Sequence, residues 1–153
     1  MSIRPLVIAA ALMCLAAPAA ALAPIQNHLN SGRAGERDHA YPLMRCGALY
    51  MASLKSAGDD VEPGKAEQVM ATAMKMIAIA SSFRLKPGDD PERVANGVMD
   101  EVESMIGDYA AEGGRAFASA SLVKQDFKYC RNFAEPFARN YDMNPPGQPG
   151  AAP

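Results

Sequence analysis

The sequence has very little histidine, and its two histidines, His28 and His39, both precede the first helical pattern. A haem bundle needs an axial ligand, usually a core histidine, and a ferritin-like di-iron centre needs inward-facing Glu-x-x-His motifs. A Ser-His-Asp or Cys-His nucleophile also needs a rigidly placed histidine. Because the predicted helices contain no histidine, the sequence predicts no catalytic residue, no metal site and no cofactor, and a protein that is not an enzyme.

Three further absences narrow the class of function. The sequence contains no CxxC pair and no glycine-rich phosphate loop. Its net charge is only −2, which argues against a nucleic-acid binder because such proteins present a basic surface. After the first residues, no apolar run is long enough to span a bilayer. We therefore expect no contact with nucleic acid, and none with a membrane once the signal peptide is removed.

The chain opens with MSIRPLVIAAALMCLAAPAAALAP, which is the pattern of a Sec-type signal peptide. Arg4 precedes an apolar run from Leu6 to Ala17, long enough for a signal-peptide core and short for a transmembrane helix. Small residues at Ala19 and Ala21 suit signal peptidase. We expect removal of residues 1–21 by cleavage after Ala21, and a protein in the periplasm or secreted; an uncleaved anchor is the alternative.

Cleavage would leave an even number of cysteines. The sequence has three, and Cys14 leaves with the signal peptide. Two cysteines in an exported chain usually pair, so we expect a disulfide between Cys46 and Cys130. Two separate buried thiols are the alternative. The bridge would restrict the unfolded chain by roughly 4 kcal/mol in the chain-entropy model.

Residues 41–141 are interpreted as one helical domain. Apolar residues recur there at helical spacing in four stretches, at about 42–54, 62–84, 91–112 and 121–141. Pro136 interrupts the last stretch and predicts a kink or an early end. Because short connections favour antiparallel neighbours, the predicted fold is an all-α, up-down four-helix bundle, with the disulfide joining its first and last helices.

Polar segments flank this domain. Residues 22–40 lack apolar periodicity and are expected to form a flexible leader, and residues 142–153, DMNPPGQPGAAP, are expected to form a disordered tail. The periodic positions define the expected core, which comprises Leu43, Tyr50, Leu54, Met70, Ile77, Phe83, Val94, Val98, Val102, Met105, Phe127, Phe133 and Phe137.

Methionine is the one abundant residue with distinctive chemistry, since the chain contains ten. Met70, Met74 and Met76 lie on the second predicted helix, which is apolar nearly all round and also carries Ile79. A small bundle would leave part of such a helix exposed, and these four residues are therefore expected to bind a partner. The alternative is a carrier that holds a small ligand or Cu(I) in a methionine-lined cavity of the bundle.

The third predicted helix is strongly acidic outside its apolar stripe and includes Glu101 and Asp108. Its acids either form a solvated face, matched within the molecule by Lys124, Lys128 and Arg131, or attract a cationic partner. The sequence thus predicts a small exported protein that acts by binding an unidentified periplasmic protein or peptide. It does not indicate the oligomeric state.

Overall fold

The computed structural model of the 153-residue chain describes residues 22–30, 39–113, 117–118 and 120–141. These residues form helices and, within the described ranges, no strand. The predicted signal peptide (1–21), the predicted tail (142–153) and residues 31–38 of the predicted leader lie outside the described residues. Within the described part, no helix is long and apolar enough to cross a membrane.

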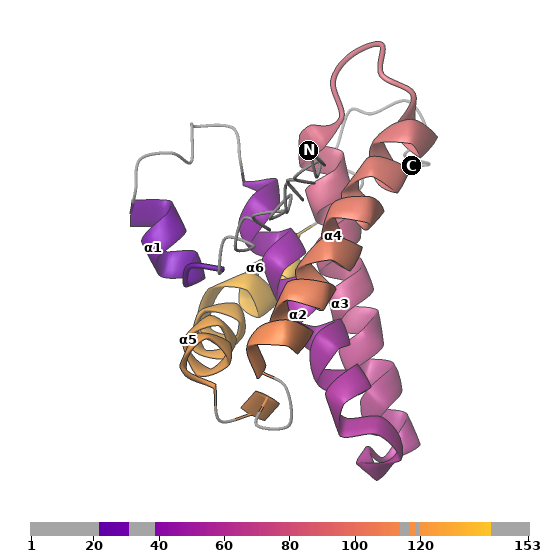
Figure 1. Ribbon diagram of the computed structural model, residues 1–153. Helices are drawn as coiled ribbons and strands as arrows, with labels where there is room; N and C mark the ends of the chain where they lie inside the picture. The colour runs from indigo at the N-terminus through magenta and orange to yellow at the C-terminus, as the bar shows by residue number, and fades with distance from the viewer. Residues whose placement is uncertain (1–21, 31–38, 114–116, 119, 142–153) are drawn as a thin grey trace, which may run out of the picture.

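Helix α2 (Ala40–Ala57) lies at the centre of the fold. It packs against α3 (Pro63–Arg84), α4 (Pro91–Gly113) and α5 (Ser121–Tyr129), as Figure 1 shows. The short 3₁₀ segment η1 (Gly58–Asp60) follows α2 and precedes α3. Every residue from Pro42 to Tyr50 is buried. The first half of α2 is therefore enclosed on all sides by its neighbours.

Helices α3 and α4 begin where local sequence signals predict. Pro63 and Pro91 open them, at positions where the missing proline N–H costs little. The Oδ1 atom of Asp90 accepts a hydrogen bond from the N–H of Glu92 at 3.0 Å. This side-chain capping satisfies one of the free donors at the start of α4.

The last helix is continuous but irregular. Helix α5 leads into the π-helical segment η3 (Cys130–Ala134) and then into α6 (Glu135–Asn140). The N–H of Glu135 donates to the carbonyl of Cys130, five residues back, which is the hydrogen bond of a π-helix. Pro136 has no N–H to donate, and its ring would crowd an α-helical turn before it. The interruption expected at Pro136 is therefore present as a widened turn just ahead of the proline.

The predicted up-down four-helix bundle is not confirmed. An additional helix, α1 (Ile25–Asn30), packs against α5. In Figure 1, α5 is seen nearly end-on, whereas α2, α3 and α4 are seen from the side, so α5 crosses these helices. The all-helical class is confirmed, and the Sγ atoms of Cys46 and Cys130 lie at disulfide distance, 2.06 Å apart, joining α2 to η3.

Helix α1 differs from the flexible leader expected at residues 22–40. Ile25 is completely buried, and its N–H donates to Oδ1 of Asp126 at 2.8 Å. Sequence periodicity did not reveal this segment because a single buried apolar side chain produces no repeating pattern.

The core lies where α2 meets α3, α4 and the α5–η3–α6 helix. Of the expected core residues, Leu43, Tyr50, Ile77, Val98, Val102 and Met105 are buried, and Leu54, Phe83, Val94 and Phe127 are half-buried. Met70, Phe133 and Phe137 are 39%, 60% and 44% exposed, so their assignment to the core is wrong.

Each of these three errors has a structural cause. Met70 lies on the outer face of α3 with Met74, whereas the neighbouring Val69 packs against the core. In the last helix, the wide turn of η3 keeps residues four apart on one face, so that Asp126, Cys130, Ala134 and Ala138 are buried. Phe133 and Phe137 consequently face outward.

Candidate interaction surface

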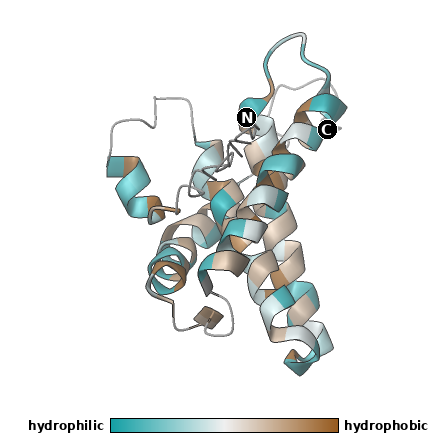
Figure 2. Ribbon diagram, viewed as in Figure 1, coloured by the Kyte–Doolittle hydropathy of each residue, from teal (hydrophilic) through white to brown (hydrophobic). Residues whose placement is uncertain are grey.

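The four apolar residues expected to bind a partner on α3 divide between its two sides. Met76 and Ile79 are fully buried, so their expected place on the surface is wrong, whereas Met70 and Met74 are 39% and 44% exposed. Helical geometry explains the division, because residues 70 and 74 share one face and residue 76 points away from it. Figure 2 shows α3 as largely pale or brown beside the teal bands of α4.

The positions of these methionines also test the alternative of a Cu(I) carrier. A Cu(I) site needs several thioethers that converge on one point, yet Met70 and Met74 lie outside while Met76 lies inside. Among the described residues, no group of three His, Cys, Asp or Glu side chains is placed to hold a metal ion either. The structure therefore brings together two of these three methionines, on an open surface.

Helix α4 carries the acidic residues predicted for it. Glu101 is exposed and forms an ion pair with Arg84 of α3, with 2.5 Å between Oε1 and Nη1. Asp108 is half-buried. Both residues therefore remain on the accessible side of the helix, although Glu101 is already paired within the molecule.

A buried polar cluster was missed by the sequence interpretation. Arg45 and Asp126 are 0% and 1% exposed and form an ion pair through Nη2 and Oδ2. Tyr109 accepts a hydrogen bond from Nε of Arg45 at 2.9 Å and donates one to Asp126. The Nη1 atom of Arg45 donates to the carbonyl of Ala23 at 3.2 Å and to the hydroxyl of Tyr41 at 2.9 Å.

The electrostatics of this cluster favour one protonation state. Burial raises the pKa of the Tyr109 phenol and the Asp126 carboxylate raises it further, although the nearby Arg45 charge opposes the shift. Burial alone would lower the pKa of the Arg45 guanidinium, but Tyr109 and Asp126 together raise it above its usual range. The cluster therefore holds a permanently charged arginine, its carboxylate and a neutral phenol.

This cluster has a structural role. Its charged atoms are closed to solvent, and their hydrogen bonds end on α2, α4, α5 and the backbone of residues 23 and 25. It thereby fastens the segment before α2 to the core. A sequence signal did exist, because Arg45 and Asp126 interrupt two apolar stripes with opposite charges, and buried charges require a partner.

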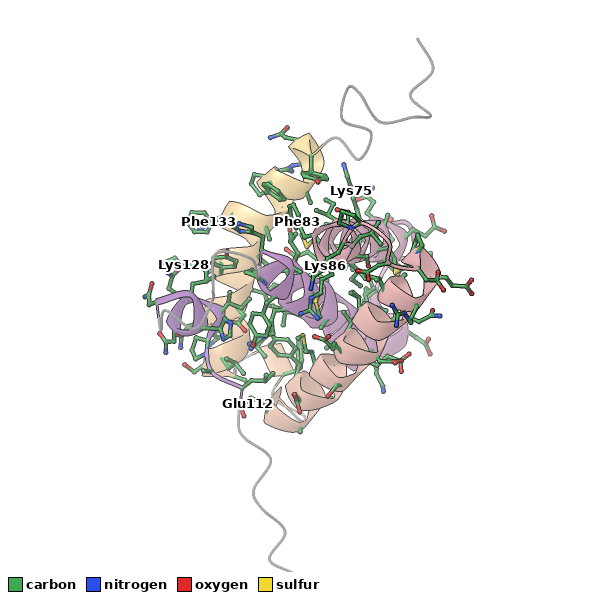
Figure 3. The ribbon with its side chains drawn as sticks, turned by 90° about the horizontal axis from the view of Figure 1, so that it is seen from above. Lys75, Phe83, Lys86, Glu112, Lys128 and Phe133 are labelled. Atoms are coloured by element: carbon green, nitrogen blue, oxygen red, sulfur yellow. A yellow bond between two sulfur atoms is a disulfide. The ribbon has the colours of Figure 1, made fainter. Side chains whose placement is uncertain are left out.

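Aromatic side chains form a ridge along the outer side of the last helix. We define the aromatic ridge as Tyr129, Phe133, Phe137 and Tyr141, spaced four residues apart. The ring centroids of Tyr129 and Phe133 are 5.3 Å apart, and those of Phe137 and Tyr141 are 5.4 Å apart. The ring centroid of Phe83, on α3, lies 5.6 Å from that of Tyr141. In Figure 3, Phe133 and Lys128 project outward from the same side of the molecule.

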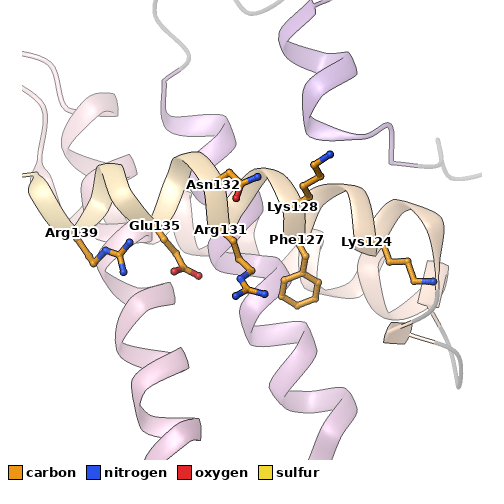
Figure 4. Close-up of a pocket in the computed structure, with 7 residues that line it drawn as sticks. All are labelled: Lys124, Phe127, Lys128, Arg131, Asn132, Glu135 and Arg139. Atoms are coloured by element: carbon orange, nitrogen blue, oxygen red, sulfur yellow. The ribbon is translucent and has the colours of Figure 1, made fainter.

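Beside this ridge lies a hollow of about 600 Å³. All its lining residues come from α5, η3 and α6, and they are Lys124, Phe127, Lys128, Arg131, Asn132, Glu135 and Arg139 (Figure 4). Glu135 accepts a hydrogen bond from the hydroxyl of Tyr50, and the Phe127 ring stacks on Tyr50 with 5.6 Å between centroids. We call the four basic residues, Lys124, Lys128, Arg131 and Arg139, the cationic row. The sequence interpretation had placed three of them on a solvated face.

Comparisons of this chain with models of protein families, with curated proteins and with solved structures each find no match.

Proposed function

We propose that this protein is exported and acts by binding a protein or peptide partner, without catalysing a reaction. The observation that carries this proposal is the aromatic ridge, in which Phe133 and Phe137 are 60% and 44% exposed. Exposed apolar side chains that gather on one surface commonly mark a site for another protein. Aromatic residues in particular contribute much of the binding free energy at such sites, because a partner removes a large area from water.

Export is supported by the signal-peptide pattern of residues 1–21 and by the pairing of Cys46 with Cys130. Disulfides persist in oxidising compartments and are rare in the cytosol. Cell fractionation followed by N-terminal sequencing tests this part of the proposal. We expect the protein in the periplasmic or culture fraction with Leu22 as its first residue, and recovery of the full chain from the cytosol would contradict it.

The binding proposal is tested by the double substitution Phe133→Ser and Phe137→Ser. Both side chains are more than 40% exposed, so the variant should remain folded, with a small decrease in melting temperature from the lost ring contact between Phe137 and Phe83. In cells treated with a cross-linker, the adduct between this protein and its partner should be lost. Leu85→Ser is the matched control, since Leu85 is similarly exposed (42%) at the C-terminal end of α3 and is not one of the ridge residues. Unchanged cross-linking in the double variant would reject the ridge as the contact.

Met70 and Met74 form a second exposed apolar pair, which retains the original expectation for α3. The substitutions Met70→Ser and Met74→Ser in the same cross-linking assay measure its contribution. Met76 and Ile79 are unsuitable for this purpose, because replacing a fully buried side chain would destabilise the fold itself. The acidic α4, with Glu101 and Asp108, is proposed to steer the approach of partners by charge.

A further inference from the structure

The cationic row follows the last helix, with Lys128 on the opposite edge of the helix to Arg131 and Arg139 (Figure 4). Lys124 and Arg139 are separated by fifteen positions on one continuous helix, which corresponds to about 22 Å at 1.5 Å per residue. Lys124, Lys128, Arg131 and Arg139 are all exposed. Among ion pairs between described residues, none involves any of these four cations. The row therefore offers positive charge along the length of this helix, with Glu135 between Arg131 and Arg139.

Carboxylates on the same surface compensate this charge only weakly. Glu135 is the acidic residue that lines the hollow, so one negative charge faces the four positive charges of the row. The acidic side chains of α4 lie on a different helix and include Glu101, which is paired with Arg84. The molecule thus separates its charge, with acids along α4 and cations along α5–η3–α6.

Apolar side chains lie on the same helix as the cations. Phe127 is half-buried within the hollow, and the aromatic ridge runs along the same helix through Phe133 and Phe137. A ligand that lies along the outside of this helix would meet positive charge and aromatic rings at the spacing of helical turns. This is the pattern with which an amphipathic segment is recognised.

We infer that the cationic row binds an acidic amphipathic helix of a partner protein, with its carboxylates against the cations and its apolar side against Phe127. This inference rests on the proposed function and names the chemistry of the partner. The acids of α4 would repel such a segment, so they direct it to α5–η3–α6.

The observations favour a peptide over other anions. A small anion would be held by cations that converge on one point, whereas these cations are spread over about 22 Å. Nucleic acids and anionic membranes present negative charge over large areas, and a chain with a net charge of −2 and an acidic neighbouring helix is repelled by such surfaces. A short acidic helix can contact the row without approaching α4.

The test uses the full exported protein and three fluorescently labelled synthetic helical peptides. One has leucines on one face and glutamates elsewhere, the second has lysine in place of every glutamate, and the third keeps the glutamates but has serine in place of leucine. Fluorescence anisotropy should show binding of the first peptide alone. Raising the NaCl concentration should weaken that binding, because salt screens exposed charge pairs.

The decisive variant is Lys124→Glu combined with Arg131→Glu, which should weaken binding of the acidic amphipathic peptide about tenfold or more. Its matched control is Lys55→Glu with Lys65→Glu, which makes the same change in charge at exposed positions where α2 ends and α3 begins. The control should bind as the wild type does, and circular dichroism should show that both variants remain folded. Equal binding by all three proteins would overturn the inference.

A membrane, a second copy of the protein or a partner that is not acidic would each give a different result with these variants. Binding of the wild type to phosphatidylglycerol vesicles, lost in Lys124→Glu with Arg131→Glu and without peptide binding, would assign the row to a membrane and overturn the inference. Self-association in sedimentation experiments that the same substitutions abolish, again without peptide binding, would assign it to a second copy. Loss of cross-linking in Phe133→Ser with Phe137→Ser, but none in the charge variant, would keep the proposed function and reject the acidic partner.

Discussion

Arg45 and Asp126 are the residues at which a single substitution should have the largest effect on stability. Asp126→Ala leaves a buried guanidinium without its carboxylate and the N–H of Ile25 without its acceptor. Loss of one member of a buried ion pair typically costs about 3–5 kcal/mol. Urea unfolding at neutral pH, followed by circular dichroism, should show a decrease of this size in the free energy of unfolding.

A second variant separates the charge from the packing in this prediction. Arg45→Met combined with Asp126→Leu removes both charges and keeps apolar volume, so it should be more stable than Asp126→Ala alone. A double variant that is less stable than Asp126→Ala would indicate that the ion pair itself, and not the unpaired charge, dominates the energetics.

Tyr109 and Tyr50 should make the protein unstable at alkaline pH. Burial raises the pKa of both phenols, and in Tyr50 the hydrogen bond to Glu135 raises it further. In the unfolded chain these tyrosines lose their protons near pH ~10, while the folded protein keeps them. Their contribution to stability is therefore complete below that pH and declines above it, by about 1.4 kcal/mol per pH unit for each tyrosine.

The measurement for this pH dependence is the free energy of unfolding at several pH values from 8 to 11. Tyr109→Phe and Tyr50→Phe should each reduce the slope above pH ~10, whatever they do to stability at neutral pH. A slope that is the same in both variants and in the wild type would show that these phenols do not cause the alkaline loss.

At the scale of elements, Gly47 sets the distance between α2 and α3. A Cβ atom at this position would lie 2.7 Å from Cγ1 of Ile77 and 3.2 Å from the carbonyl oxygen of Ala73. Gly47→Ala should therefore destabilise the protein by about 1–3 kcal/mol through overpacking, although alanine is the better helix former. Thermal unfolding of the variant measures this effect.

Gly97 on α4 is the matched control for Gly47. A Cβ atom there would meet nothing within 4 Å, so Gly97→Ala gains helix propensity without a clash. We expect it to stabilise the protein by about 0.5–1 kcal/mol. Equal changes at Gly47 and Gly97 would mean that close packing between α2 and α3 is not the reason for glycine at position 47.

The elements that the sequence predicted well are those with local signals. The start of α4 follows from Asp90 and Pro91, whose effects act within a few residues. The pairing of Cys46 with Cys130 follows from cysteine number and predicted export. By contrast, η3 contains a hydrogen bond between residues five apart in the sequence, which changes the direction in which the following side chains point. A periodicity of 3.6 residues per turn, applied across this segment, therefore places Phe133 and Phe137 on the wrong face.

The site residues that were missed depend on contacts distant in the sequence. Ile25 and Asp126 are 101 residues apart, and Arg45 and Asp126 are 81 apart. The sequence pattern also gave no reason to choose between the two sides of α3, because apolar residues occupy nearly every position from Val69 to Ala80. Burial of Met76 and exposure of Met74 are decided by where α2 lies.

At the scale of the whole molecule, the disulfide should be the strongest single constraint on the unfolded chain. Cys46 and Cys130 are separated by 84 residues and are both fully buried. A bridge that closes a loop of this length lowers the entropy of the unfolded state by an amount worth about 4 kcal/mol in the chain-entropy model. Reduction, or the variant Cys46→Ala with Cys130→Ala, should lower the free energy of unfolding by a similar amount.

Mass spectrometry of the exported protein tests the pairing directly. Alkylation under denaturing conditions should add no label without reductant and two labels after reduction, whereas two labels without reductant would contradict the bond. A variant that lacks residues 1–21 and stays in the cytosol allows the same protein to be compared in an oxidising and a reducing compartment. Because the cytosol keeps thiols reduced, this variant should carry two alkylated cysteines and unfold at a lower urea concentration. If it proves as stable as the exported protein, the packing of α2 against η3, and not the covalent link, supplies the constraint.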